Sequence, residues 1–255
     1  MMFEVATDLA LLLILAGFLA GFVDAIAGGG GLITVPALLL AGASPVETLA
    51  TNKLQGTFGA ATATVAYARA GQVDLRTQLR MALISAGAGA GGATMAHLMP
   101  ADVLRLVMPV ILIAVALFFA FKPGLSDADR AQRMTPALFA VTAVPLIAGY
   151  DGFFGPGTGS FFMLGFVMLA GYGVLRATAH TKLLNFASNL GALMVFALSG
   201  SMWWAVGFAM ALAQIGGAAL GARLAMRVGA RLIKPLLVVT SAAMAARLLW
   251  QVWGG

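Results

Sequence analysis

The chain reads Asp24-Ala-Ile-Ala-Gly28-Gly29-Gly30-Gly31 near its start and Asp151-Gly-Phe-Phe-Gly155-Pro156-Gly157-Thr158-Gly159-Ser160 near its middle. In both stretches an aspartate stands four residues before a glycine-rich break in an otherwise apolar segment. A second similarity follows each break, Thr51-Asn52-Lys53-Leu54 in the first half and His180-Thr181-Lys182-Leu183 in the second. Each motif lies about half of the 255 residues from its counterpart. This doubling of a broken apolar segment is typical of secondary transporters.

The composition places the chain in lipid. Hydrophobic residues make up 61% and charged residues 9%, whereas soluble domains have about 25% charged residues. The mean hydropathy is +0.98, and apolar runs long enough to cross about 30 Å of hydrocarbon recur along the chain. The net charge of +6 does not indicate a nucleic-acid partner, because the basic residues lie in short connections between apolar runs. We therefore expect an all-α integral membrane protein with the lipid bilayer as its surroundings.

The apolar runs divide each half of the chain into five segments. We expect them at 8–27, 30–41, 46–69, 74–98 and 102–121, and at 135–151, 157–171, 175–199, 202–224 and 231–253. The second segment of each half is shorter than the ~20 residues that an upright span needs. With the segment before it, this short segment predicts a broken or re-entrant hairpin. The fold prediction is about eight transmembrane helices plus two such hairpins, ten segments in all.

The basic residues predict how the chain is oriented. They avoid the connections near Gly42, Met99 and Gly200 and cluster in three other connections. These clusters are Arg69, Arg76 and Arg80; Lys122, Arg130 and Arg133; and Arg223, Arg227, Arg231 and Lys234. Placing the basic connections in the cytoplasm puts both termini outside. Because five segments is an odd number, the first repeat (1–121) and the second (135–255) then have inverted topology. Residues 122–134 form a cytoplasmic linker, and the location is the cytoplasmic (inner) membrane, with several passes.

The glycine-rich breaks are candidates for anion binding. Glycine adopts positive φ, so that successive N–H groups can point into one concavity, and such nests bind anions. The candidate residues are Gly28, Gly29 and Gly30 in the first break, and Gly157, Thr158, Gly159 and Ser160 in the second. The hydroxyls of Thr158 and Ser160 would add donors. The alternative is that the glycines only let helices pack closely, but their matched positions after an aspartate favour function.

Asp24 and Asp151 are ionisable residues in apolar surroundings, which makes each a candidate for function. Burial favours the neutral form of a carboxyl group, so either residue could take up and release a proton. The alternative, which is compatible with the first, is that each side chain caps a nearby helix start. We favour Asp151 for proton coupling, because the glycines around it are expected to leave it the less buried of the two.

Two lysines and three asparagines complete the predicted site. Lys182, Asn185 and Asn189 share one face of a helix, and the first half offers Asn52 and Lys53 at the matched place. A cation with neutral amide donors suits an anionic substrate. The alternative for the lysines is that they extend to the membrane interface, as lysines near span ends usually do. Lys182 and Asn185 are favoured as functional because the pattern is repeated.

Other chemistry has little support in the sequence. Cysteine is absent, so there is no disulfide or thiolate, and no His-rich motif predicts a metal site. His97 and His180 are expected at the membrane interface. No cofactor is expected, and a homo-oligomer is left open.

Both motif pairs resemble the TauE/SafE sulfite exporter family over essentially the whole chain. The resemblance rests on Gly-Phe-Val-Asp24-Ala-Ile-Ala-Gly-Gly-Gly-Gly-Leu with Ala-Thr-Asn52-Lys53, and on Asp151-Gly-Phe-Phe-Gly-Pro-Gly-Thr-Gly-Ser-Phe with Lys182-Leu-Leu-Asn185-Phe-Ala-Ser-Asn189. It implies a bacterial cytoplasmic-membrane carrier of small anions, often sulfur oxyanions or organosulfonates.

The resulting hypothesis is a secondary active transporter of small anions that works by alternating access, is coupled to protons, and exports sulfite, an organosulfonate or a related sulfur anion. Two alternatives were weighed. An intramembrane enzyme such as a lipid-pyrophosphate phosphatase would need arginines and acid–base residues at the glycine loops, and the breaks contain neither Arg nor Glu. An anion channel would need rings of pore-lining groups from an oligomer. We therefore expect a carrier and not an enzyme.

Overall fold

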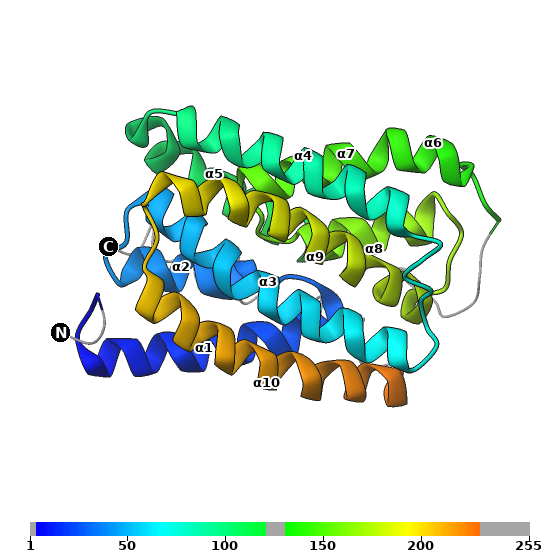
Figure 1. Cartoon of the computed structure of the whole chain (residues 1–255), viewed down its shortest axis with the longest axis horizontal. Helices are drawn as coiled ribbons and strands as arrows, with labels where there is room; N and C mark the ends of the chain where they lie inside the picture. Colours follow the sequence, from blue (N-terminus) through cyan, green and yellow to red (C-terminus); the bar gives the residue numbers. More distant parts are fainter. Residues whose placement is uncertain (1–3, 121–130, 230–255) are drawn as a thin grey trace.

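The computed structural model describes residues 4–120 and 131–229. Within these ranges the chain forms helices and no strand, which confirms the predicted all-helical class for this part. The helices are α1 Thr7–Ala27, α2 Gly31–Leu40, α3 Pro45–Arg69, α4 Leu79–Leu98, α5 Ala101–Ala120, α6 Pro136–Val141, α7 Ala143–Phe153, α8 Thr158–Met168, α9 Val174–Ser199 and α10 Trp204–Val228. They run roughly along the long axis of the molecule (Figure 1). The expected segment 231–253 lies outside the described residues.

Four helical stretches in the described ranges are long and apolar enough to cross a membrane: Thr7–Ala27, Pro136–Phe153, Val174–Ser199 and Trp204–Val228. Large apolar side chains such as Leu146 and Leu198 are exposed on the outside of the bundle, as expected where lipid is the solvent. By contrast α2 and α8 have only 10 and 11 residues. At ~1.5 Å per residue each is about half as long as the hydrocarbon layer is thick.

The structure differs from the expected segments at two places. The segment expected at 135–151 is divided into α6 and α7 at Thr142, because Pro145 lacks an N–H and its ring clashes with the carbonyl four residues earlier. The segment expected from residue 74 begins only at Leu79. There the side chain of Asp74 accepts a hydrogen bond from the N–H of Arg76 (2.9 Å), which forms a turn in place of the first helical turn.

Local sequence explains where the long helices begin. Ser44 and Glu47 form a reciprocal capping box at the start of α3, and Pro45 occupies its first position, where a missing N–H costs nothing. At the start of α10 the carboxylate of Glu4 accepts hydrogen bonds from the N–H groups of Ala205 and Val206 at 2.9 and 3.1 Å. The N-terminal segment is thereby attached to the second half of the chain.

The halves exchange their fourth helices. Helix α4 packs against α7 and α9 of the second half, while α10 packs against α1 and α3 of the first, and α3 and α9 pack against each other at the centre. Glycines bring the backbones together in both groups. A Cβ atom at Gly152 of α7 would overlap the carbonyl oxygen of Gly89 on α4, and one at Gly217 of α10 would overlap the carbonyl oxygen of Phe18 on α1.

The two glycine-rich breaks lie against each other inside the bundle. Gly28 (φ 72°) and Gly155 (φ 96°) have the positive φ values with which the chain leaves α1 and α7. A Cβ atom at Gly28 would overlap the backbone of Gly159 at the start of α8. The hydroxyl of Ser160 donates to the carbonyl of Ala27 (2.9 Å) and to that of Gly28. The motifs that the sequence repeats are therefore in direct contact in the fold.

Candidate functional site

Two ion pairs join the halves of the chain. The Nζ atom of Lys53 on α3 lies 2.8 Å from Oδ1 of Asp151 on α7, and the Nζ atom of Lys182 on α9 lies 3.2 Å from Oδ2 of Asp24 on α1. Each pair thus takes its lysine from one half and its aspartate from the other. Both lysine side chains have an exposed fraction of 0%. The alternative that these lysines extend to the membrane interface is therefore wrong for this structure.

Asp151 is fully enclosed by side chains. Besides Lys53, its carboxylate accepts hydrogen bonds at Oδ2 from the Ser188 hydroxyl (2.5 Å) and from Nδ2 of Asn189 (3.0 Å). Its side chain is 2% exposed, against 14% for Asp24. The expectation that Asp151 is the less buried aspartate is wrong, because α4 and α9 cover the side that the neighbouring glycines leave open.

Asp24 lies in the first glycine nest. Its Oδ1 atom accepts hydrogen bonds from the N–H groups of Gly29 (3.0 Å) and Gly30 (3.4 Å), just before α2 begins. Lys182 donates to its Oδ2 atom and to its backbone carbonyl. The anion seated in the nest is the chain's own carboxylate, and binding of a substrate anion there stays a prediction. The N–H groups of Gly29 and Gly30 precede Gly31, the first residue of α2, so the side chain holds the glycine break and makes no capping hydrogen bond to the first turn of the helix.

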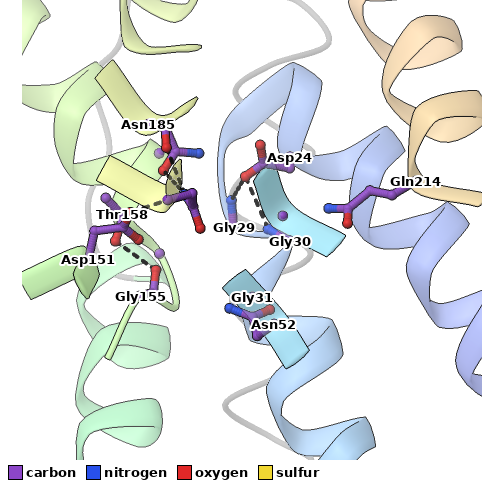
Figure 2. A pocket seen from close by; sticks show the side chains of 14 residues that line it. Asp24, Gly29, Gly30, Gly31, Asn52, Asp151, Gly155, Thr158, Asn185 and Gln214 are labelled. Atoms are coloured by element: carbon purple, nitrogen blue, oxygen red, sulfur yellow. Dashed lines mark hydrogen bonds between the residues drawn. The ribbon is translucent and has the colours of Figure 1, made fainter. Parts of the chain in front are cut away.

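A small cavity lies where the breaks and the helices α3, α9 and α10 meet (Figure 2). About 30 Å³ of it is open to the centre of a water-sized sphere. It is lined by both aspartates, by the glycines of both breaks and by amide side chains: Asp24, Gly29, Gly30, Gly31, Asn52, Gly56, Asp151, Gly155, Gly157, Thr158, Gly159, Asn185, Asn189 and Gln214. In the described part of the chain, backbone and side-chain dipoles from both halves thus face one small space.

Two of the amides are oriented to donate into the cavity. The Oδ1 atom of Asn52 accepts hydrogen bonds from the Thr34 hydroxyl (2.7 Å) and from Nε2 of Gln55 (2.9 Å). The Oδ1 atom of Asn185 accepts from Nδ2 of Asn189 (3.1 Å). Since the oxygens of Asn52 and Asn185 are used inside the protein, their NH₂ groups remain as donors beside the cavity. Neutral donors of this kind can bind an anion without adding charge.

Most of the predicted binding residues line the cavity, but four do not. Gly28 and Ser160 hold the two breaks together, and Lys53 and Lys182 lie behind the aspartates that they pair with. The hydroxyls of Thr158 and Ser160 were expected to donate to a ligand. Instead Thr158 donates to the carbonyl of Gly155 (2.7 Å), and Ser160 donates to the first break.

Sequence reasoning missed Gln214 and Ser188. Gln214 of α10 has a 3% exposed side chain that points into the cavity (Figure 2), and its Oε1 atom has no hydrogen-bond partner among the described residues. The signal was a lone amide in the middle of an apolar span, which is itself a mark of function. Ser188 stands between Asn185 and Asn189 in the polar stripe of α9, where its position on the same helix face could have been read.

The histidines lie away from this site. The ring of His180 packs against Phe166 and Tyr172, with ring centroids 5.6 and 4.9 Å away, so it belongs to an aromatic cluster. His97 is exposed near the end of α4. Within residues 4–120 and 131–229, no group of three or more His, Cys, Asp or Glu side chains could hold a metal ion.

A bundle of apolar helices that encloses charged and amide side chains at its centre is typical of membrane transporters. Comparison with known proteins agrees. The chain belongs to the sulfite exporter TauE/SafE family, whose model matches residues 13–248. This confirms the family that the paired motifs resemble.

Three curated relatives cover nearly the whole chain. The chain is 57% identical to the probable membrane transporter protein ORF9 of a Sinorhizobium species, over 96% of this chain and 94% of that protein. It is 45% identical to the probable membrane transporter protein YfcA of Escherichia coli K12, over 99% and 94%. It is 42% identical to a probable membrane transporter protein of Haemophilus influenzae, over 98% of both. These descriptions are compatible with a protein that is not an enzyme. No solved structure matches the chain.

Proposed function

We propose that this membrane transporter is a secondary active carrier of small anions that works by alternating access. The proposal rests on the two ion pairs that cross between the halves, Lys53–Asp151 and Lys182–Asp24, beside a cavity that amide donors line. The donors of Asn52 and Asn185 come from α3 and α9, and the glycine breaks supply backbone N–H groups. These are groups that bind oxygen atoms of an anion, and both halves of the chain contribute them equally.

The charges of the site support coupling to protons. Lys53 and Lys182 are balanced by Asp24 and Asp151, so the empty site has no net charge. An anion that enters brings a negative charge into a place with little water, which is costly unless it is compensated. A proton taken up by Asp24 or Asp151 restores the balance. Anion and proton would then move together.

The packing supports two repeats of inverted topology, residues 1–121 and 135–255. Helix α4 lies on α7 and α9 as α10 lies on α1 and α3, so the same arrangement occurs twice around the α3–α9 contact. In carriers built from such repeats, one bundle rocks against the other around a fixed site, and here the bundles are α1, α3 and α10 on one side and α4, α7 and α9 on the other. The crossed ion pairs would hold the repeats together in the closed state. The cavity is small, with about 30 Å³ open to the centres of water molecules, and a small cavity suits such a state.

The substrate class follows from the family. The family is described as sulfite exporters, and we propose sulfite, an organosulfonate or a related sulfur oxyanion, exported across the cytoplasmic membrane. A multi-pass chain in the inner membrane, with both termini outside and 122–134 as a cytoplasmic linker, completes the proposal.

Counterflow in proteoliposomes tests whether the protein is an anion carrier. Vesicles that contain the purified chain are loaded with unlabelled thiosulfate or sulfite, and entry of the same labelled anion is followed with no imposed gradient of charge. A carrier gives transient accumulation above equilibrium, whereas a channel gives none. Asn185→Ala should abolish the accumulation, and Thr94→Ala, an exposed position on α4, should not change it. Absence of counterflow with every sulfur anion in wild-type vesicles would contradict the proposed function.

A further inference from the structure

The two aspartates are held in different ways. Within the described residues, the hydrogen bonds that the Asp151 carboxylate accepts come from side chains, namely Lys53, Ser188 and Asn189. The Asp24 carboxylate accepts two from the backbone of the break and one from a lysine of the other half. Asp24 is also the more exposed of the two, and its exposed part faces the cavity. Asp151 is therefore fixed in place, whereas Asp24 can leave its position through a space that already adjoins it.

The groups that hold Asp24 form a site for oxyanions. We define the oxyanion subsite as the N–H groups of Gly29 and Gly30 together with the Nζ atom of Lys182. Gly28 and Gly29 have φ values of 72° and 147°, which turns the following N–H groups toward one point, as in anion-binding nests. A carboxylate and a sulfonate present the same kind of oxygen atoms to such donors. The seated carboxylate shows that the subsite accepts a singly charged anionic group.

Gln214 is a second, independent indication of a ligand at this point. It reaches the cavity from α10 through a notch between Gly21 and Gly59, where a Cβ atom at either glycine would overlap the Gln214 side chain or backbone. A buried polar atom without a partner, such as its Oε1, is rare in proteins. An amide beside the Asp24 carboxylate can accept a hydrogen bond from a protonated carboxyl group or donate one to a substrate oxygen.

We propose that Asp24 is a tethered occupant of the oxyanion subsite, which the substrate anion displaces when Asp24 takes up a proton. This inference rests on the proposed function. One solvent proton binds a carboxylate oxygen of Asp24, and the neutral side chain turns into the cavity toward Gln214. The substrate's oxygen atoms then take the hydrogen bonds of Gly29, Gly30 and Lys182. With a singly charged substrate such as methanesulfonate, one negative charge and one proton enter together, so the net charge of the site stays at zero. With a dianion the displacement of Asp24 still takes up one proton, and the site gains one negative charge.

The groups around Asp24 do not accept the proton in this mechanism, so Asp24 itself is the proton acceptor. Lys182 faces it from α9 and keeps its charge to bind the incoming anion. Tyr67 of α3 lies nearby, but its hydroxyl donates to the carbonyl of Ala25 (3.0 Å). α8 presents Ser160 and α10 presents Gln214, neither of which titrates. The Lys53–Asp151 pair remains intact on the other side of the cavity.

Counting protons on anion binding tests this mechanism. The purified full chain in detergent is titrated calorimetrically with methanesulfonate, thiosulfate and sulfate, none of which binds protons near neutral pH. Buffers of different ionisation enthalpy give the number of protons taken up. Wild-type protein should take up one proton per anion, and its affinity should fall about tenfold for each unit by which pH rises, the slope of one linked proton. In Asp24→Asn the anion should bind without proton uptake and independently of pH. Asp24→Glu, which keeps a carboxyl group at this place, and Thr94→Ala on the exposed face of α4 should retain the uptake.

The results separate this mechanism from the proposed function. Binding of an anion to wild-type protein without proton uptake would overturn the role of Asp24 and leave the carrier intact, and this measurement needs no variant. Proton uptake that persists in Asp24→Asn would do the same. Failure of all three anions to bind the wild-type protein would overturn both.

Discussion

Lys53 of α3 and Asp151 of α7 form an ion pair of 2.8 Å between residues 98 positions apart, and both side chains are sealed from solvent. Such a pair costs much desolvation, so that its partners depend on each other. We predict that Lys53→Ala lowers the stability by about 3–5 kcal/mol, because it leaves the Asp151 carboxylate buried without its cation. The double variant Lys53→Met/Asp151→Leu should recover most of this loss. Unfolding temperatures of the wild type, Lys53→Ala, the single variants Lys53→Met and Asp151→Leu and the double variant, all in one detergent, measure it. Additive effects of the single changes would contradict the pairing.

The contact between the two breaks predicts a difference between two glycines of nearly equal φ. Gly28 and Gly71 have φ values of 72° and 71°, but a Cβ atom meets the backbone of Gly159 at Gly28 and nothing within 4 Å at Gly71. Gly71→Ala should cost roughly 1–2 kcal/mol from its left-handed conformation alone. Gly28→Ala should cost clearly more and abolish transport, because it separates the breaks. Equal loss of stability in the two variants would mean that the contact is not tight.

The packing of α4 on α7 gives a similar comparison for helix interiors. A Cβ atom at Gly152 would overlap the Gly89 carbonyl, whereas one at Gly91 would meet open space. Gly91→Ala should raise stability by up to about 1 kcal/mol, the difference in helix propensity. Gly152→Ala should lower the free energy of unfolding by several kcal/mol, because the backbones of α4 and α7 must separate. Thermal unfolding of the purified variants should show a higher unfolding temperature for Gly91→Ala and a lower one for Gly152→Ala. A Gly152→Ala protein as stable as the wild type would refute the close approach of α7 to α4.

The sequence predicted much of this arrangement because its motifs are doubled. Matched positions identified Asp24 and Asp151, the glycines and the amides of Asn52, Asn185 and Asn189 as one set, and the structure brings them to one cavity. The sequence could not predict which lysine pairs with which aspartate, because each lysine could neutralise the aspartate of its own half or that of the other half. Only the exchange of α4 and α10 and the central α3–α9 contact decide it. Gln214 was missed for the same reason, since α10 reaches the first break through tertiary packing alone.

Gln214 predicts a loss of transport without a loss of folding. Its amide faces the cavity, and a hydrogen bond to a charged group is worth about 1.5–3 kcal/mol. Gln214→Ala should therefore weaken anion binding about tenfold or more, as measured by the substrate concentration at half-maximal counterflow. The matched control is Gln132→Ala, since Gln132 is exposed and donates to the carbonyl of Met134. If both variants transport like the wild type, Gln214 plays no part in binding.

Finally, the fold predicts on which side of the membrane each connection lies. The basic α3–α4 connection and the end of α10 lie at one end of the molecule, while the α4–α5 and α9–α10 connections, which have almost no basic residues, lie at the other (Figure 1). Because positive charge favours the cytoplasm, Thr77→Cys should be protected in intact cells from a maleimide that cannot cross the membrane. Ala101→Cys should react with it. The chain has no cysteine of its own, so each signal reports one site, and permeabilised cells should label both. The reverse pattern would turn the molecule over and place the start of α1 in the cytoplasm. Equal labelling of both sites in intact cells would remove the assigned orientation altogether.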